Sequence, residues 1–230
     1  MSKRVAIVQS SYIPWKGYFD LIRHVDEFIL FDDVQFTKRD WRNRNRIKTP
    51  RGPLWLSIPV QVKGRYLQAI KDTVVSDHAW SRTHWQTIRS NYAKAPFFPQ
   101  FKDALEDLFL GCDHASLSEV NYRFTAGLCR MLGIGTRLSW SMSYVVSPGK
   151  TERLVSLCRQ AGATEYVSGP AARSYIDPAR FEEAGITLSF FDYAGYPEYQ
   201  QLYPPFDHFV SVIDLILNTG ADAPAYMLPV

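Results

Sequence analysis

The chain has 230 residues, of which 46% are hydrophobic and 21% are charged. This length and composition are typical of a globular domain with a sizeable core, and they exclude a disordered chain, a collagen-like fibre and a small disulfide-stabilised protein. Cys112, Cys129 and Cys158 are an odd number of cysteines without CxxC spacing, so neither a disulfide framework nor a zinc knuckle is predicted. No apolar run approaches the ~20 residues that cross a bilayer. We expect a cytoplasmic protein without a membrane span.

The net charge of +3 is unevenly distributed along the chain. Residues 38–51 carry seven Lys or Arg residues and one acid, a local charge of 7 − 1 = +6, which leaves 3 − 6 = −3 for the remainder. A basic segment on a mildly acidic body indicates an anionic ligand that binds at one place.

The first part of the chain predicts a βαβ unit. Residues 5–8 form a short apolar run typical of a buried strand, and a loop rich in turn-forming residues follows at 9–17. Apolar residues then recur with helical spacing from 18 to 25, and a second apolar run occupies 28–31. Such units build parallel sheets with ligand sites at the carboxyl ends of the strands.

Further helices and strands alternate along the rest of the chain. Hydrophobic spacing and turn residues predict a strand at 54–60, helices within 77–133, a helix at 154–161, strands at 166–167 and 186–191, and a helix at 206–218. We therefore predict an α/β fold, a single Rossmann-like three-layer domain over 1–230, with a helical insertion at about 77–133.

The loop after the first strand is the first candidate site, and it offers Gln9, Tyr12, Trp15, Gly17 and Tyr18. A glycine near a helix start lets a ligand approach free backbone N–H groups, which favour anions, and the aromatic rings can stack on a base or a sugar. The alternative is a packed turn whose aromatic side chains fill the edge of the core.

Carboxylates follow the second strand at Asp32 and Asp33, with Gln35 close behind. Adjacent residues of a strand point to opposite faces, so both carboxylates serve one site only if the strand has already ended. One of them can act as a general base or orient an amine, whereas the alternative is a polar strand end with a turn-forming aspartate.

The segment from Arg42 to Lys48 alternates arginine with asparagine. In an extended conformation, Arg42, Arg44 and Arg46 share one face, while Asn43, Asn45 and Ile47 share the other. Arginine binds phosphate in bidentate fashion, so the segment predicts an anion site, with a solvated edge strand as the alternative.

Two other polar features, on predicted helices, are candidates for a functional role. His84 lies on a helical face with Trp80 and can be either a general base or a core residue, and the histidines show no metal-ligand spacing, so no metal site is predicted. In the last helix, a polar stripe favours a solvent-facing side, and Asp214 would need partners if the stripe were buried. The stripe consists of Asp207, Ser211, Asp214 and Asn218.

Several sequence blocks together resemble the WbqC-like family of bacterial proteins. The blocks are VQSSYIPWKGYFDLI (8–22), FDDVQFTKRDWRNRNRIKT (31–49), LWLSIPV (54–60), HAWSRTHWQTIRSNYAKAPFF (78–98), TERLVSLCRQAGATEYVSGPAARSYID (151–177), FFDYAGYPEYQQLYPPF (190–206) and SVIDLILNTG (211–220). The family tends to have proline after the first glutamine, whereas here Ser10 follows Gln9.

This resemblance implies a role in the assembly of O-antigen or another surface sugar, as a glycyl or aminoacyl transferase that modifies an amino sugar. We therefore expect an N-acyltransferase whose acceptor is an amine, such as that of a nucleotide-linked amino sugar. Arg42, Arg44 and Lys48 would hold phosphate, and Asp32, Asp33 or His84 would take the proton of the amine. Main-chain N–H groups near Ser168 and Gly169 would stabilise an oxyanion, and Tyr175 and Tyr199 are also assigned to substrate binding.

Two alternative functions remain open. The start of the chain is similar to HUP-type nucleotidyltransferases, although Trp15 and Tyr18 occupy the place of their histidine signature, so nucleotidyl transfer or adenylation is the second hypothesis. The third is a non-catalytic nucleotide-sugar binding protein within a biosynthetic complex. The expected partner is an anionic nucleotide sugar or acyl donor, with aminoacyl-tRNA as another possible donor, and the residues identify no cofactor.

Overall fold

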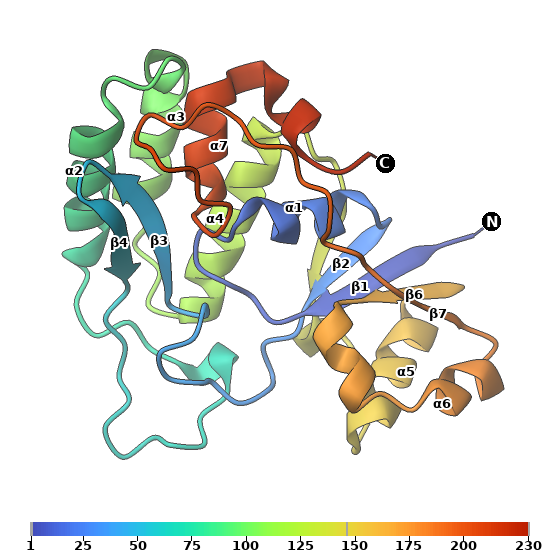
Figure 1. Cartoon of the computed structure of the whole chain (residues 1–230). Helices are drawn as coiled ribbons and strands as arrows, with labels where there is room; N and C mark the ends of the chain where they lie inside the picture. The colour runs from blue at the N-terminus through green and yellow to red at the C-terminus, as the bar shows by residue number, and fades with distance from the viewer. Residues whose placement is uncertain (1, 146, 230) are drawn as a thin grey trace.

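A five-stranded parallel sheet lies at the centre of the computed structural model, which describes residues 2–145 and 147–229. The strands follow the order β5-β2-β1-β6-β7 (Figure 1). Their bounds are β1 Arg4–Val8, β2 Glu27–Leu30, β5 Arg137–Trp140, β6 Glu165–Ser168 and β7 Thr187–Phe190. Helices flank both faces of the sheet, so the predicted α/β, Rossmann-like three-layer fold is confirmed.

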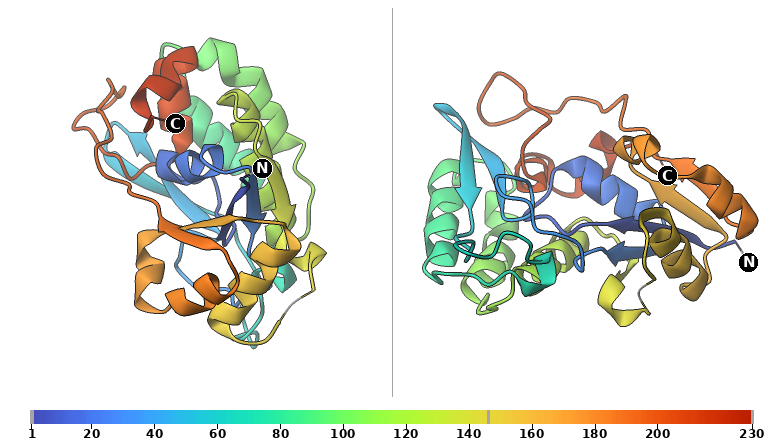
Figure 2. Two further views of the ribbon diagram at one scale, coloured as in Figure 1. Left: turned by 90° about the vertical axis from the view of Figure 1, so that its right-hand side faces the viewer. Right: turned by 90° about the horizontal axis from the view of Figure 1, so that it is seen from below.

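Side chains of the central strand alternate between two cores on opposite faces of the sheet. Val5 and Ile7 share a core with α5 (Lys150–Gln160) and α6 (Pro178–Glu183). Ala6 belongs to the other core, with α1 (Lys16–Arg23) and α4 (Leu117–Met131). The two layers lie on opposite sides of the sheet in Figure 2. Burial of both faces explains why β1 has a continuous apolar run rather than an alternating one.

The chain between β2 and β5 forms an antiparallel hairpin and three helices at one end of the sheet (Figure 1). The hairpin consists of β3 (Arg44–Thr49) and β4 (Gly52–Ser57), and the helices are α2 (Trp80–Tyr92), α3 (Phe98–Leu110) and α4. The last α-helix, α7 (Val212–Thr219), packs against α3, α4 and β3. Four short 3-10 helices complete the described elements: η1 (Ile70–Asp72), η2 (Ser141–Ser143), η3 (Pro170–Ser174) and η4 (Gly220–Tyr226).

The last helix differs from its prediction in both length and burial. It begins at Val212 rather than at 206, and the Ser211 side chain caps it by accepting a hydrogen bond from the Ile213 N–H. The predicted solvent-facing stripe is wrong, because Ser211, Asp214 and Asn218 are all buried. Other elements pack around this helix, and the buried Asp214 accepts hydrogen bonds from the hydroxyl groups of Tyr92 and Tyr199. None of the helices that the structure describes is long and apolar enough to cross a membrane.

The order of the strands creates a crevice beside β1. From β1 the chain builds outward through β2 to β5, then crosses over to place β6 and β7 on the other side of β1. The chain therefore leaves β1 toward β2 on one side and leaves β6 toward β7 on the other, so the strand order reverses between β1 and β6. In open α/β sheets, ligands bind outside the carboxyl ends of the strands at this kind of switch in strand order.

Candidate functional site

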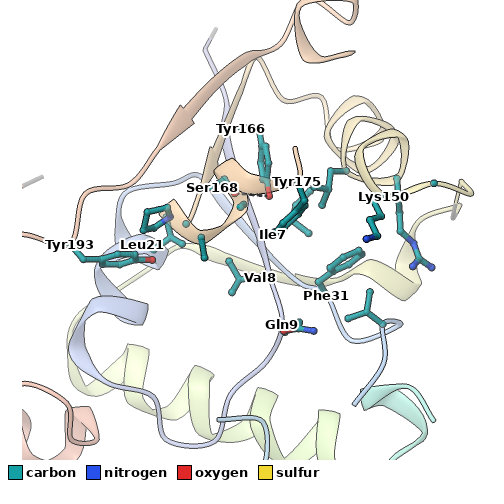
Figure 3. Close-up of a pocket in the computed structure, with 18 residues that line it drawn as sticks. Ile7, Val8, Gln9, Leu21, Phe31, Lys150, Tyr166, Ser168, Tyr175 and Tyr193 are labelled. Atoms are coloured by element: carbon teal, nitrogen blue, oxygen red, sulfur yellow. Dashed lines mark hydrogen bonds between the residues drawn. The ribbon is translucent and has the colours of Figure 1, made fainter. Parts of the chain in front are cut away.

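A cavity of about 490 Å³ lies at the carboxyl ends of β1 and β6, where the strand order switches (Figure 3). We call it the switch-point pocket. It is lined by Ile7, Val8, Gln9, Leu21, Phe31, Val34, Gly149, Lys150, Arg153, Leu154, Tyr166, Ser168, Gly169, Pro170, Ala171, Ala172, Tyr175 and Tyr193.

The first turn of α5 gives this pocket a basic wall. Lys150 begins the helix and Arg153 follows three residues later, so the two cations lie on the same side of it. Asp33 holds the guanidinium in place, because its Oδ2 accepts a hydrogen bond from Arg153 Nη2 at 2.9 Å. Asp33 in turn accepts a second hydrogen bond, from Ser141 Oγ at 2.6 Å. Two cations beside a helix N-terminus provide a favourable environment for a phosphate group.

Aromatic side chains form much of the remaining wall of the switch-point pocket. In Figure 3, Phe31 and Lys150 enter from one side and Tyr193 from the opposite side. Tyr175 is 55% exposed, whereas Tyr166 is buried. Burial raises the pKa of Tyr193 to about 12, so its hydroxyl stays protonated at neutral pH and remains a hydrogen-bond donor. A pocket with cations and aromatic rings suits a ligand that has both phosphates and a planar ring.

A second cavity, of about 320 Å³, shares Val8 with the first as a lining residue. We call it the tryptophan pocket, and it is lined by Val8, Ser11, Pro14, Trp15, Tyr18, Trp41, Arg42, Asn45 and Phe209. Asn45 joins the hairpin to the first loop, because its Nδ2 donates to the carbonyl oxygens of Tyr12 and Ile13 at 3.2 and 3.0 Å. Ile13 has a φ of 37°, an unusual conformation for a β-branched residue, and it directly precedes Pro14 and Trp15, which line the pocket.

Comparison with known proteins places the chain in a family. Residues 9–226 match the model of the WbqC-like protein family. The chain belongs to this family. A relative from Mycobacterium tuberculosis (strain ATCC 25618 / H37Rv), named "Uncharacterized protein Rv1507c", is 53% identical over 225 residues, which cover 98% of this chain and 97% of the relative. No solved structure matches the chain.

In this WbqC-like protein, the residues of the first loop separate into three environments. Gln9 lines the switch-point pocket, whereas Trp15 and Tyr18 line the tryptophan pocket. Tyr12 is fully buried and lines neither pocket. The space above Gly17 is filled by the Trp15 ring, since a Cβ atom built there would lie 2.3 Å from Trp15 Cζ2. The glycine therefore permits close packing of the indole ring within the loop itself.

The structure places His84 in the hydrophobic core. Its Nδ1 lies 2.8 Å from the hydroxyl oxygen of Tyr12, and the ring packs edge-on against Trp80. Burial lowers the pKa of His84 to about 4, an effect that a hydrogen bond to the Ser57 backbone opposes. His84 lines neither pocket, so its contacts are those of a neutral core histidine.

Asp32 and Asp33 point to different sides of the sheet. Asp32 is fully buried and accepts hydrogen bonds from the Ser10 N–H at 2.9 Å and from the Ser118 hydroxyl on α4. Burial raises the pKa of Asp32, and the two serine hydrogen bonds oppose this rise. Asp33 instead faces Arg153 on α5. The two carboxylates therefore do not converge, and Asp33 is the one that contacts a residue of the switch-point pocket.

The arginine–asparagine segment does not act as one unit. Arg42 and Asn45 line the tryptophan pocket. Arg44 stacks on Trp55 of the hairpin, with 4.2 Å between the guanidinium carbon and the ring centroid. Asn43 donates to the Ile58 carbonyl, and the Lys48 ammonium group donates to the carbonyl of Pro205. Of the predicted cationic cluster, Arg42 is thus the member that lies beside Trp15.

The other predicted residues also fall into separate groups. Ser168, Gly169 and Tyr175 line the switch-point pocket. Tyr199 instead donates its hydroxyl to the buried carboxylate of Asp214. Gln35 lies at the surface and donates to the Tyr66 carbonyl, away from both pockets.

Sequence reasoning missed Lys150 and Arg153, which supply the cations of the switch-point pocket. The available signal was the order Gly149-Lys150-Thr151 directly before a helical run, since a glycine and a cation at a helix start favour anions. Their approach to the ends of β1 and β2 depends on the crossover from β5 to β6, which local spacing does not reveal.

Proposed function

We propose that this WbqC-like protein is an acyltransferase that binds a nucleotide-linked amino sugar in the switch-point pocket and acylates its amine. The observation that carries the proposal is the combination, at the switch in strand order, of Lys150 and Arg153 with an aromatic wall. The cations suit the diphosphate of such a substrate, and Phe31 and Tyr175 suit its base or sugar ring.

The reaction would need two substrates held side by side. Val8 lines both the tryptophan pocket and the switch-point pocket, which supports a second substrate held near the first. The amine attacks the activated acyl carbon and forms the new C–N bond, while the bond from that carbon to the donor breaks and releases coenzyme A or tRNA. The proton of the amine leaves to solvent or to a nearby base, and the released thiolate or ribose oxygen takes up a proton from solvent. In this scheme the rate gain comes chiefly from alignment of the two substrates.

A non-catalytic nucleotide-sugar binding protein is the second candidate. The residues that line the switch-point pocket include no cysteine, histidine or carboxylate, and the Ser168 hydroxyl donates to the Tyr166 hydroxyl rather than to a base. Turnover distinguishes the two candidates. The full chain would be incubated with a nucleotide-linked amino sugar and an activated acyl donor, either acyl-coenzyme A or aminoacyl-tRNA, and the acylated sugar would be sought by mass spectrometry.

Nucleotide binding itself can be tested by isothermal titration calorimetry with nucleoside diphosphates and the matching nucleosides. The diphosphates should bind more tightly, and Lys150→Ala or Arg153→Ala should weaken them by roughly tenfold to a hundredfold, the range for one hydrogen bond to a charged group. Lys102→Ala is the matched control, because this lysine lies on α3 outside both pockets. Equal affinity for nucleosides and diphosphates, or unchanged binding in both pocket variants, would refute the nucleotide role.

A further inference from the structure

The tryptophan pocket contains a buried cation that lacks a hydrogen-bonding partner. Arg42 is 9% exposed, and its guanidinium makes no hydrogen bond with the residues that the structure describes. Both Nε and Nη1 are buried without a partner. Asp40 forms a salt bridge with Arg42, but its Oδ2 lies 3.7 Å from Nε, too far for a hydrogen bond. Although burial raises the pKa of Asp32 overall, the charge of Arg42 lowers it.

The backbone around Arg42 is fixed, so the side chain is held at the pocket. Asn121 of α4 donates to the Arg42 carbonyl at 2.9 Å and to Ser10 Oγ at 2.9 Å. The neighbouring carbonyl of Trp41 accepts from the Tyr12 N–H at 3.1 Å. These contacts tie the residues before the hairpin to the first loop and to α4. A guanidinium placed in this way, with unused donors, is preorganised to bind an anion.

The surroundings of Arg42 favour one class of anion. The pocket walls are largely apolar and aromatic, with Trp15, Trp41 and Phe209 among them. A buried charge is costly unless an opposite charge and hydrogen bonds compensate it. A carboxylate brings one negative charge and two coplanar oxygens, which match a single guanidinium in bidentate geometry. A phosphate monoester carries more charge and suits the two cations of the switch-point pocket better.

We propose that the tryptophan pocket binds a ligand with a free carboxylate and an apolar or aromatic body, whose carboxylate pairs with Arg42. The ligand body would lie between the indole rings, in the volume of about 320 Å³. Carboxylate binding at Arg42 is independent of the proposed function. Only the further assignment of this ligand as the second substrate rests on that function. The two sites can be tested separately, because nucleotide binding is assigned to Lys150 and Arg153.

Benzoate is a suitable probe, with benzamide as its neutral analogue and phenyl phosphate as its more highly charged one. Titrations would be followed by NMR through the indole N–H signals of the full-length chain. Benzoate should bind saturably and should shift two of these signals, which Trp15→Phe and Trp41→Phe would assign. Benzamide should bind at least about tenfold more weakly, because it lacks the charge that strengthens the hydrogen bonds.

Two arginine variants separate binding from folding. Arg42→Met should weaken benzoate binding at least about tenfold. Its midpoint of thermal unfolding should equal or exceed that of the wild type, since an apolar side chain of similar length replaces a buried guanidinium whose Nε and Nη1 have no hydrogen-bond partner. Arg44→Met is the matched control and should bind benzoate normally, because Arg44 stacks on Trp55 and does not line the pocket.

Several results would overturn the inference. Benzamide or phenyl phosphate that binds as tightly as benzoate would refute a carboxylate site, as would benzoate binding that survives Arg42→Met or that fails to saturate. A clearly lower unfolding midpoint in Arg42→Met would show that the arginine serves the fold instead.

A further variant separates the two sites. Loss of diphosphate binding in Lys150→Ala, with benzoate binding intact, would show that this site is distinct from the proposed nucleotide site.

Discussion

Acid should destabilise the protein through His84, and the magnitude follows from its surroundings. Burial against Tyr12 and Trp80 lowers the pKa of His84 from 6.5 to about 4. Between these two values the unfolded chain binds a proton that the folded chain excludes, so the free energy of unfolding rises with pH in this window. Each unit of pKa shift corresponds to about 1.36 kcal/mol, so the contribution of His84 to the free energy of unfolding is at most about 3 kcal/mol. From pH 7 down to pH 4.5, the expected loss is about 2 kcal/mol.

Urea denaturation of the wild type and of His84→Gln at both pH values would measure this contribution. Glutamine can keep hydrogen bonds to Tyr12 and to the Ser57 backbone, and it does not titrate. Burial raises the pKa values of Asp32 and Asp214, which makes their own contribution to stability fall as pH rises. That contribution is common to both proteins and cancels in the difference. If the two proteins lost the same stability on acidification, the assignment of His84 as a neutral core residue would be refuted.

Two further substitutions test the packing around the candidate site. Tyr199→Phe removes one of the hydrogen bonds accepted by Asp214 and should lower the free energy of unfolding by about 1.5–3 kcal/mol in urea denaturation. Gly17→Ala drives a methyl group into the Trp15 ring and should cost about 1–3 kcal/mol, with a change in tryptophan fluorescence. The matched controls are Tyr203→Phe, which removes a hydrogen bond to the Asn91 carbonyl, and Gly135→Ala, where no atom lies within 4 Å. Losses no larger than those of the controls would contradict both assignments.

The fold could be predicted because its central strands are buried on both faces. Continuous apolar runs at 5–8 and 28–31 marked β1 and β2, and helical spacing between them marked α1. The edge strand β5 escaped prediction, since Arg137 and Ser139 interrupt its apolar residues and its side chains are only partly buried. The burial of α7 was equally hidden, because it depends on distant elements that pack around it.

The candidate site was harder to predict than the fold. Its position after the first strand made Gln9 a candidate, since strand ends carry sites in this architecture, and Gln9 lines the switch-point pocket. Residue type alone grouped Arg42 with Arg44 and Lys48, although these three side chains lie in different surroundings. The surroundings of each cation are set by contacts with residues distant in the sequence, such as that between Lys48 and the Pro205 carbonyl.

The side chain of Val8 bounds both cavities at the tip of the central strand. In the proposed arrangement of two substrates, the three carbon atoms of this side chain would set how closely the ligands of the two pockets approach one another. Shortening this residue to alanine would enlarge the space that it borders in each pocket, and lengthening it to leucine would reduce that space. The proposed arrangement therefore predicts that the size of one aliphatic side chain sets the spacing between the two ligands.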